Sequence, residues 1–67
     1  MITTKQDLIN RLQDILALEK IAFERYKEDA EKFHDVKIIK VIEKIKDDEK
    51  NHIKMLEHLL NYLVAHD

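Results

Sequence analysis

The sequence predicts an all-α protein in which two long helices form one antiparallel hairpin, a single domain over residues 1–67 that dimerises into a four-helix bundle. Two observations predict this fold. The 67 residues include no Gly and no Pro, the residues that most often interrupt helices, whereas the helix-favouring Leu, Ile, Lys and Glu are abundant. Apolar residues also recur every three or four positions in both halves of the chain, which is the spacing of one helix face.

The first helix is expected over residues 4–33 and the second over residues 36–65. Thr4, with Asp7 three positions later, resembles a capping box at the start of the first helix. The letters FHDV mark the one expected break, because Asp35 suits the N-cap of the second helix. So short a connection predicts an antiparallel hairpin.

The size of the chain predicts self-association. A chain of 67 residues buries only about 60% of the surface that its unfolded form exposes. No disulfide compensates for this, because the sequence contains no Cys. A single hairpin is therefore expected to be marginally stable, and a homodimer or a ring of dimers is the expected form.

Charge and hydropathy argue against several classes of partner. The 12 basic and 14 acidic residues are mixed, without the long basic run of a nucleic-acid arm. No apolar stretch approaches the roughly 18 residues of a membrane span, and the N-terminal letters MITTKQDL lack the apolar region of a signal peptide. Lys and Glu share the polar faces, unlike the Lys-rich face of a membrane-surface helix. No nucleic-acid or membrane partner is expected, and cytoplasmic residence is the default.

Each expected helix has an apolar seam that contains polar residues. The seam of the second helix has alternating steps of four and three and consists of Ile38, Ile42, Ile45, Glu49, His52, Leu56, Leu59 and Leu63. The first helix has a similar seam of Leu8, Leu12, Ile15, Glu19, Ala22, Tyr26, Ala30 and Phe33. Further apolar residues widen both stripes beyond what a two-helix contact covers. They are Ile9, Leu16, Phe23, Ile39, Ile53, Leu60 and Val64.

Glu19, Glu49 and His52 stand in the seams at one level. Glu19 and Glu49 each lie 15 residues from His34, the centre of the expected turn, so both are about 22 Å from the bend. His52 is one helical turn from Glu49 on the same face. Because all three lie near the middle of their helices, a two-fold axis through the centre of a dimer brings two copies of the trio together. The resulting layer holds four carboxylates and two imidazoles.

Carboxylates gathered in one core layer favour metal binding. Each unpaired buried ion costs several kcal/mol, and a pair of divalent cations cancels the charge. Oxygen-rich ligation with one imidazole per metal suits iron, manganese or zinc. The alternative is a polar cluster without metal that sets register or oligomeric state, as polar core residues do in coiled coils.

These residues resemble a known superfamily. The segment 12–60 looks like a half-length member of the ferritin and rubrerythrin superfamily, in which two helices each supply a Glu and two others each supply Glu-x-x-His. It most resembles the encapsulated-ferritin type, whose two-helix subunit dimerises to complete the bundle, and it is similar to the designed due ferri hairpins. The resemblance is carried by Glu19, by Tyr26 seven residues later, and by the run Asp48-Glu49-x-x-His52.

The resemblance implies a di-iron site with two Fe ions per dimer, at which Fe(II) is oxidised to Fe(III) with O2 or peroxide. It implies that Glu19, Glu49 and His52 are the metal ligands and catalytic residues. Tyr26 is implied as a further catalytic residue beside the site, hydrogen-bonded to a ligand carboxylate. Asp48 is implied as the acid that accepts a hydrogen bond from the ligand histidine of the partner.

The chain departs from encapsulated ferritins at two points. Leu18 and Ile21 stand where those proteins carry acidic residues near the route by which metal enters. We also expect no tail after Asp67 that would target the chain to an encapsulating shell. These departures weaken the resemblance for that entry route and for residence in a shell. An encapsulating shell stays open as a partner, and iron storage stays open beside simple oxidation.

Two classes of function stay open. One is a di-iron oxidoreductase, and the other is a non-catalytic helical-hairpin dimer that holds a structural metal or a polar core cluster and acts as an interaction module. In the second class Tyr26 only fills the core and Asp48 is a solvated acid. His34, His58 and His66 fall outside the seams and are expected on the surface.

Overall fold

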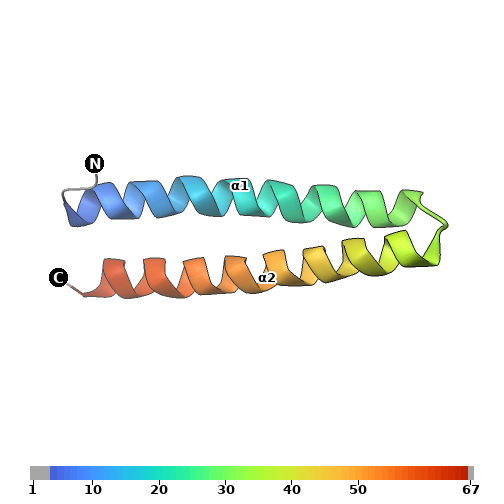
Figure 1. Ribbon diagram of the computed structural model, residues 1–67. Helices are drawn as coiled ribbons and strands as arrows, with labels where there is room; N and C mark the ends of the chain where they lie inside the picture. The colour runs from blue at the N-terminus through green and yellow to red at the C-terminus, as the bar shows by residue number, and fades with distance from the viewer. Residues whose placement is uncertain (1–3, 67) are drawn as a thin grey trace.

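The computed structural model describes residues 4–66 and contains two helices, α1 (Lys5–Lys32) and α2 (Val36–Ala65). The helices run antiparallel along nearly their whole length and are joined by residues 33–35 (Figure 1). The hairpin measures 49 × 19 × 15 Å. Both expected helices are confirmed, with ends that differ from the prediction by at most one residue. Across residues 4–66, neither helix has a window apolar enough to cross a membrane.

Side-chain caps define both helix starts. Thr4 Oγ1 accepts a hydrogen bond from the Asp7 backbone N–H at 3.1 Å. Asp35 Oδ1 accepts two, from the backbone N–H groups of Lys37 at 2.8 Å and Ile38 at 3.2 Å. These bonds satisfy first-turn donors that have no carbonyl partner within the helix. Both predicted caps are therefore confirmed.

The core between the helices is small and lies toward the ends away from the turn. Within residues 4–66 the buried apolar side chains are Ile9, Leu12 and Leu60. Partly buried leucines pack against them, namely Leu8, Leu16, Leu56 and Leu63. Full burial of one such side chain contributes about 1.5–3 kcal/mol. Three buried side chains are a weak basis for an independent fold, because ordering the chain costs about 1–2 kcal/mol per residue.

The helix contact covers only one flank of each apolar stripe. Ile9 and Leu60, which the sequence places beside the seams, are among the most buried residues. The seam residues Phe33, Ile38 and Leu59 are exposed instead. Each helix has a single partner, so the flank turned away from that partner stays open.

The two long faces of the hairpin differ in chemistry. On one side, called here the closed face, Lys20 of α1 and Glu57 of α2 form an ion pair across the helices at 3.9 Å. Lys46 precedes Glu57 by eleven residues, about three helical turns, and so lies on the same side of α2. Its Nζ atom is 2.7 Å from Glu43 Oε2, and this hydrogen bond raises the pKa of the Lys46 ammonium. Charged side chains thus border this face.

The other side, called here the open face, is apolar and uncovered. It consists of Ile15, Leu18, Ala22 and Tyr26 of α1 and of Ile38, Val41, Met55 and Leu59 of α2. Leu18 and Met55 are 66% and 68% exposed. The chain exposes 5482 Å² in total, whereas a compact monomer of 8.1 kDa exposes about 4,500 Å². The hairpin therefore leaves more surface uncovered than a compact protein of its mass.

Candidate metal centre

Glu19, Glu49 and His52 come together at the middle of the hairpin, as the sequence predicts. Glu19 lies at the midpoint of α1, and the other two flank the midpoint of α2. One ligand atom from each residue lies within 4.8 Å of the others. A bound ion lies about 2.1 Å from each ligand atom, so two ligands of one ion are at most about 4.2 Å apart. A small side-chain adjustment would place all three around one ion.

The His52 imidazole lies between the two carboxylates without bonding to either. Its Nδ1 atom is 3.9 Å from Glu19 Oε2 and 4.0 Å from Glu49 Oε1. Both distances exceed the 2.7–3.2 Å range of a protein hydrogen bond. The two carboxylates and the imidazole therefore lie close to one another without hydrogen bonds between them. Their ligand atoms are spaced so that they could hold a cation.

Each of the two glutamates buries one carboxylate oxygen that lacks a partner within residues 4–66. The Oε2 atoms of Glu19 and Glu49 are inaccessible to solvent and accept no hydrogen bond from this part of the chain. The two side chains are 28% and 19% exposed. A buried acceptor that lacks a donor costs about 1–3 kcal/mol. A divalent cation bound by these oxygens would remove that cost.

An apolar hollow of about 490 Å³ opens beside the cluster. Its walls come from both helices, and it is lined by Ile15, Glu19, His52, Met55, Leu56 and Leu59. His52 is one of these lining residues, and 57% of its side chain is exposed. Such walls strengthen charge interactions once water is excluded. The hollow lies on the open face, so in a single chain the site is walled on one side only.

Tyr26 lies apart from the ligand cluster. It lines a second hollow on α1 together with Leu18, Ile21, Ala22, Arg25 and Asp29. Within residues 4–66 its hydroxyl forms no hydrogen bond. The reason is its position seven residues beyond Glu19, about 10 Å along the helix. The implied hydrogen bond to a ligand carboxylate is therefore not formed within one chain.

Asp48 is paired locally, and Met55 is an addition to the site. Asp48 Oδ1 accepts a hydrogen bond from Lys44 Nζ at 3.1 Å, one turn away on α2. Its implied bond to the histidine of a partner stays a prediction. Met55 lines the ligand hollow, although it is not one of the seam residues. Its spacing of three residues from His52 is the signal that could have found it.

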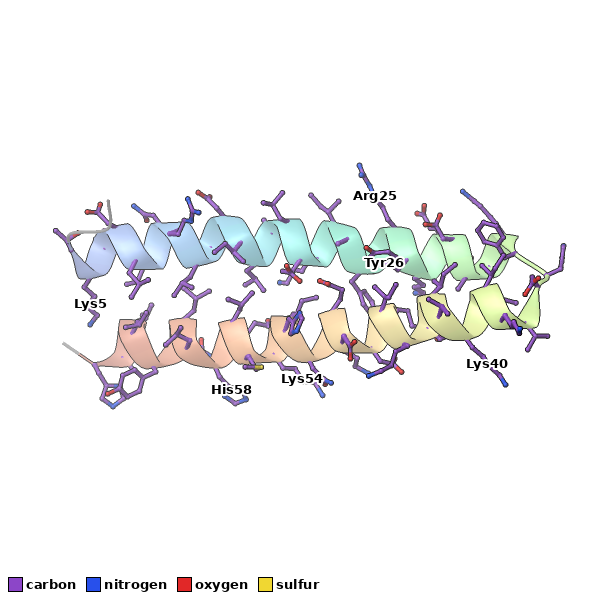
Figure 2. All side chains as sticks on the ribbon, viewed as in Figure 1. Lys5, Arg25, Tyr26, Lys40, Lys54 and His58 are labelled. Carbon is purple, nitrogen blue, oxygen red and sulfur yellow. The ribbon has the colours of Figure 1, made fainter. Side chains whose placement is uncertain are left out.

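The remaining histidines lie outside the candidate centre. His34, His58 and His66 are exposed, as predicted. His58 points away from α1 (Figure 2). His66 stacks on Tyr62 with ring centroids 4.3 Å apart. None of the three belongs to the Glu19, Glu49 and His52 cluster.

Comparison with known proteins does not assign the chain to a family. No family model, no curated protein and no solved structure matches it. The functional assignment therefore rests on the cluster and its surroundings.

Proposed function

We propose that two copies of the chain join their open faces into a ferritin-like four-helix bundle, and that the shared centre oxidises Fe(II) to Fe(III). The observation that carries this proposal is the pair of buried Oε2 atoms of Glu19 and Glu49, which have no hydrogen-bond partner within residues 4–66. The His52 imidazole lies about 4 Å from a carboxylate oxygen of each glutamate. One hairpin offers two carboxylates and one imidazole. A two-fold pair offers twice that number, which is a suitable donor set for two divalent ions.

The donor set suits iron. Carboxylates are hard oxygen donors and imidazole suits iron as well, so the ligands bind Fe(II) and stabilise the more highly charged Fe(III) product. Manganese and zinc accept the same donors. In the overall reaction, two Fe(II) ions each lose one electron and become Fe(III). The two electrons and two protons reduce either O2 to hydrogen peroxide or hydrogen peroxide to two molecules of water.

The residues of the chain have distinct roles in this proposal. Glu19, Glu49 and His52 bind and orient the two substrate ions. Ile15 and Leu59, which line the hollow, exclude bulk water once the open face is covered. Tyr26 and Asp48 support the ligands. In the dimer, Asp48 breaks its hydrogen bond with Lys44 and accepts one from the imidazole of the partner instead.

Aerobic oxidation of Fe(II) tests the proposal. The dimer is expected to bind two Fe(II) ions without oxygen and, on exposure to air, to consume oxygen rapidly and develop near-ultraviolet absorbance of ferric product. Glu49→Gln should reduce the rate by at least about a hundredfold, since two ligand charges are lost per dimer. Glu28→Gln is the matched control, because Glu28 is exposed and forms no ion pair within residues 4–66.

The alternative outcomes are distinct. Tight binding of two ions without oxidation above the buffer rate would favour the non-catalytic module with a structural metal. Equal binding by the parent and Glu49→Gln would show that these residues are not ligands. No binding at all would leave a polar core cluster.

A further inference from the structure

We propose that the second copy docks on the open face with its turn at the opposite end, so that α1 packs against α1 of the partner. We infer further that a charged rim of α1 selects this orientation. The rim consists of Arg11, Asp14, Arg25 and Asp29. The inference takes its two-fold axis from the proposed shared site, but it concerns the surface around that site.

The rim residues border the open face and have no ion-pair partner within residues 4–66. Arg25 and Asp29 line the hollow that also contains Leu18, and Arg25 extends away from α2 (Figure 2). Positions 11, 18, 25 and 29 are spaced by seven, seven and four, so they follow one edge of the helix. Asp14 is one turn from Arg11. Within residues 4–66 none of the four rim residues forms an ion pair.

Opposite charges match along α1 when the turns lie at opposite ends. If a two-fold axis crosses α1 at the level of Glu19, a residue that precedes Glu19 lies beside the partner residue that follows Glu19 by the same distance along the helix. Asp14 precedes Glu19 by five residues and Arg25 follows it by six, which is about 7.5 and 9 Å along the helix. The mismatch of about 1.5 Å is small beside the length of an arginine side chain.

The second rim pair also joins opposite charges, with a larger mismatch of about 3 Å along the helix. Arg11 precedes Glu19 by eight residues and Asp29 follows it by ten, about 12 and 15 Å along the helix. Since a two-fold interface repeats each contact, each dimer would gain two Asp14–Arg25 pairs and two Arg11–Asp29 pairs. Leu18 lies next to the axis and faces its own copy.

The other orientation gives a poorer charge match. With both turns at the same end, α1 lies against α2 of the partner and residues at equal depth from the turn meet. Arg25 and Lys44 lie nine and ten residues from His34, so two cations meet. Asp48, 14 residues from His34, meets the apolar side chain of Ile21 at 13 residues. The one opposite-charge pair of this arrangement would be Asp29 with Lys37.

The central position of the metal cluster favours the same orientation. With the turns at opposite ends, only an axis through mid-length overlaps the two hairpins along the full 49 Å. Glu19 lies at this level, at the midpoint of α1. With the turns together the axis runs along the bundle, and a shared site could then lie at any level. The mid-length position of the cluster is therefore the position that a dimer with its turns at opposite ends requires.

A spin label at the turn measures the orientation directly. The sequence has no Cys and His34 is exposed, so His34→Cys gives one label per chain. With the turns at opposite ends the two labels are about 45 Å apart, twice 15 residues at 1.5 Å. With the turns together they are within about 20 Å, the width of a bundle with helices 8–10 Å apart. Pulsed electron paramagnetic resonance on the full chain is expected to give the long distance, and the short distance overturns the proposal.

Charge reversal tests the role of the rim. Arg25→Glu and Asp14→Arg should each raise the dimer dissociation constant by about tenfold, because each removes two attractive pairs and creates repulsion. The two reversals together should restore association. Lys54→Glu is the control, because this exposed side chain points away from α1 (Figure 2). A double variant that dissociates more readily than either single variant overturns the rim pairing.

These results separate the orientation from the proposed activity. Dimers with the long label distance that neither bind nor oxidise Fe(II) would support the orientation and overturn the iron site. Dimers with the short distance that oxidise Fe(II) would do the reverse. Sedimentation that shows only monomer at micromolar concentration would overturn both.

Discussion

The carboxylates of Glu19 and Glu49 are costly for so small a fold. Within residues 4–66 each buries one oxygen without a hydrogen-bond donor, and only three apolar side chains are buried. One buried acceptor without a donor costs about 1–3 kcal/mol, which is comparable to the gain from one buried leucine. Residues of this cost are expected to oppose folding of the metal-free chain. A bound ion offsets the cost by mass action.

Removing one of these carboxylates should therefore stabilise the metal-free protein and abolish the proposed activity. Glu19→Leu is expected to raise the melting temperature in the presence of a chelator, by an amount corresponding to roughly 1 to 4 kcal/mol, and to eliminate Fe(II) oxidation. Circular dichroism measures the first effect. Glu28→Leu, at an exposed position, should change stability by no more than about 0.5 kcal/mol. If Glu19→Leu melts below the parent, the carboxylate is already stabilised by another partner.

The stability of the two helices depends on their N-caps, because the contact between the helices buries few side chains. Asp35 begins α2 with two backbone hydrogen bonds, and its extended backbone, with φ −74° and ψ 119°, reverses the chain within residues 33–35. A defined turn keeps α1 and α2 in register, and register keeps Glu19 level with Glu49. The cap therefore affects both the start of α2 and the alignment of the candidate centre.

Loss of the Asp35 cap should destabilise the hairpin. Asp35→Ala is expected to lower the free energy of unfolding by about 1 kcal/mol, since two first-turn N–H groups lose their acceptor. Urea denaturation measures the change. Asp35→Asn should retain most of the stability, and Asp47→Ala, an exposed position within α2, should leave it equal or slightly higher. Equal stability of Asp35→Ala and the parent would show that the cap does not contribute.

At the scale of the whole molecule, the hairpin has one closed face and one open face. Ion pairs such as Lys20 with Glu57 border the first, while the second exposes Leu18, Val41 and Met55. Side chains of this size are normally buried, and a contiguous apolar face indicates an interaction surface. Covering that face would also complete the walls of the hollow beside His52.

Thermal stability should consequently depend on protein concentration. If folding is coupled to dimerisation, the melting temperature of the parent rises as the concentration increases from about 1 to 100 μM, because mass action favours the dimer. Met55→Glu places a charge on the open face and should lower both the melting temperature and its dependence on concentration. A melting temperature that is constant over this range would indicate a self-sufficient monomer.

Local rules predicted much of this structure from the sequence alone. Helix bounds followed from the absence of Gly and Pro and from the caps at Thr4 and Asp35, because helix hydrogen bonds and caps join residues near one another in the chain. The shared level of Glu19 and Glu49 followed from equal spacing on either side of the turn. Seam periodicity also identified the three clustered residues before any contact was known.

Only the tertiary structure decided which flank of each stripe is covered. Ile9 and Leu60 became core, while Leu59 and the imidazole of His52 stayed on the open face. Periodicity defines a stripe, but the rotation of each helix about its axis depends on how side chains of both helices interlock. The structure likewise shows that Asp48 forms an ion pair with Lys44, one turn away on the same helix. The residues of a helix determine where its apolar stripe lies. Which flank of that stripe is buried depends on the helix that packs against it.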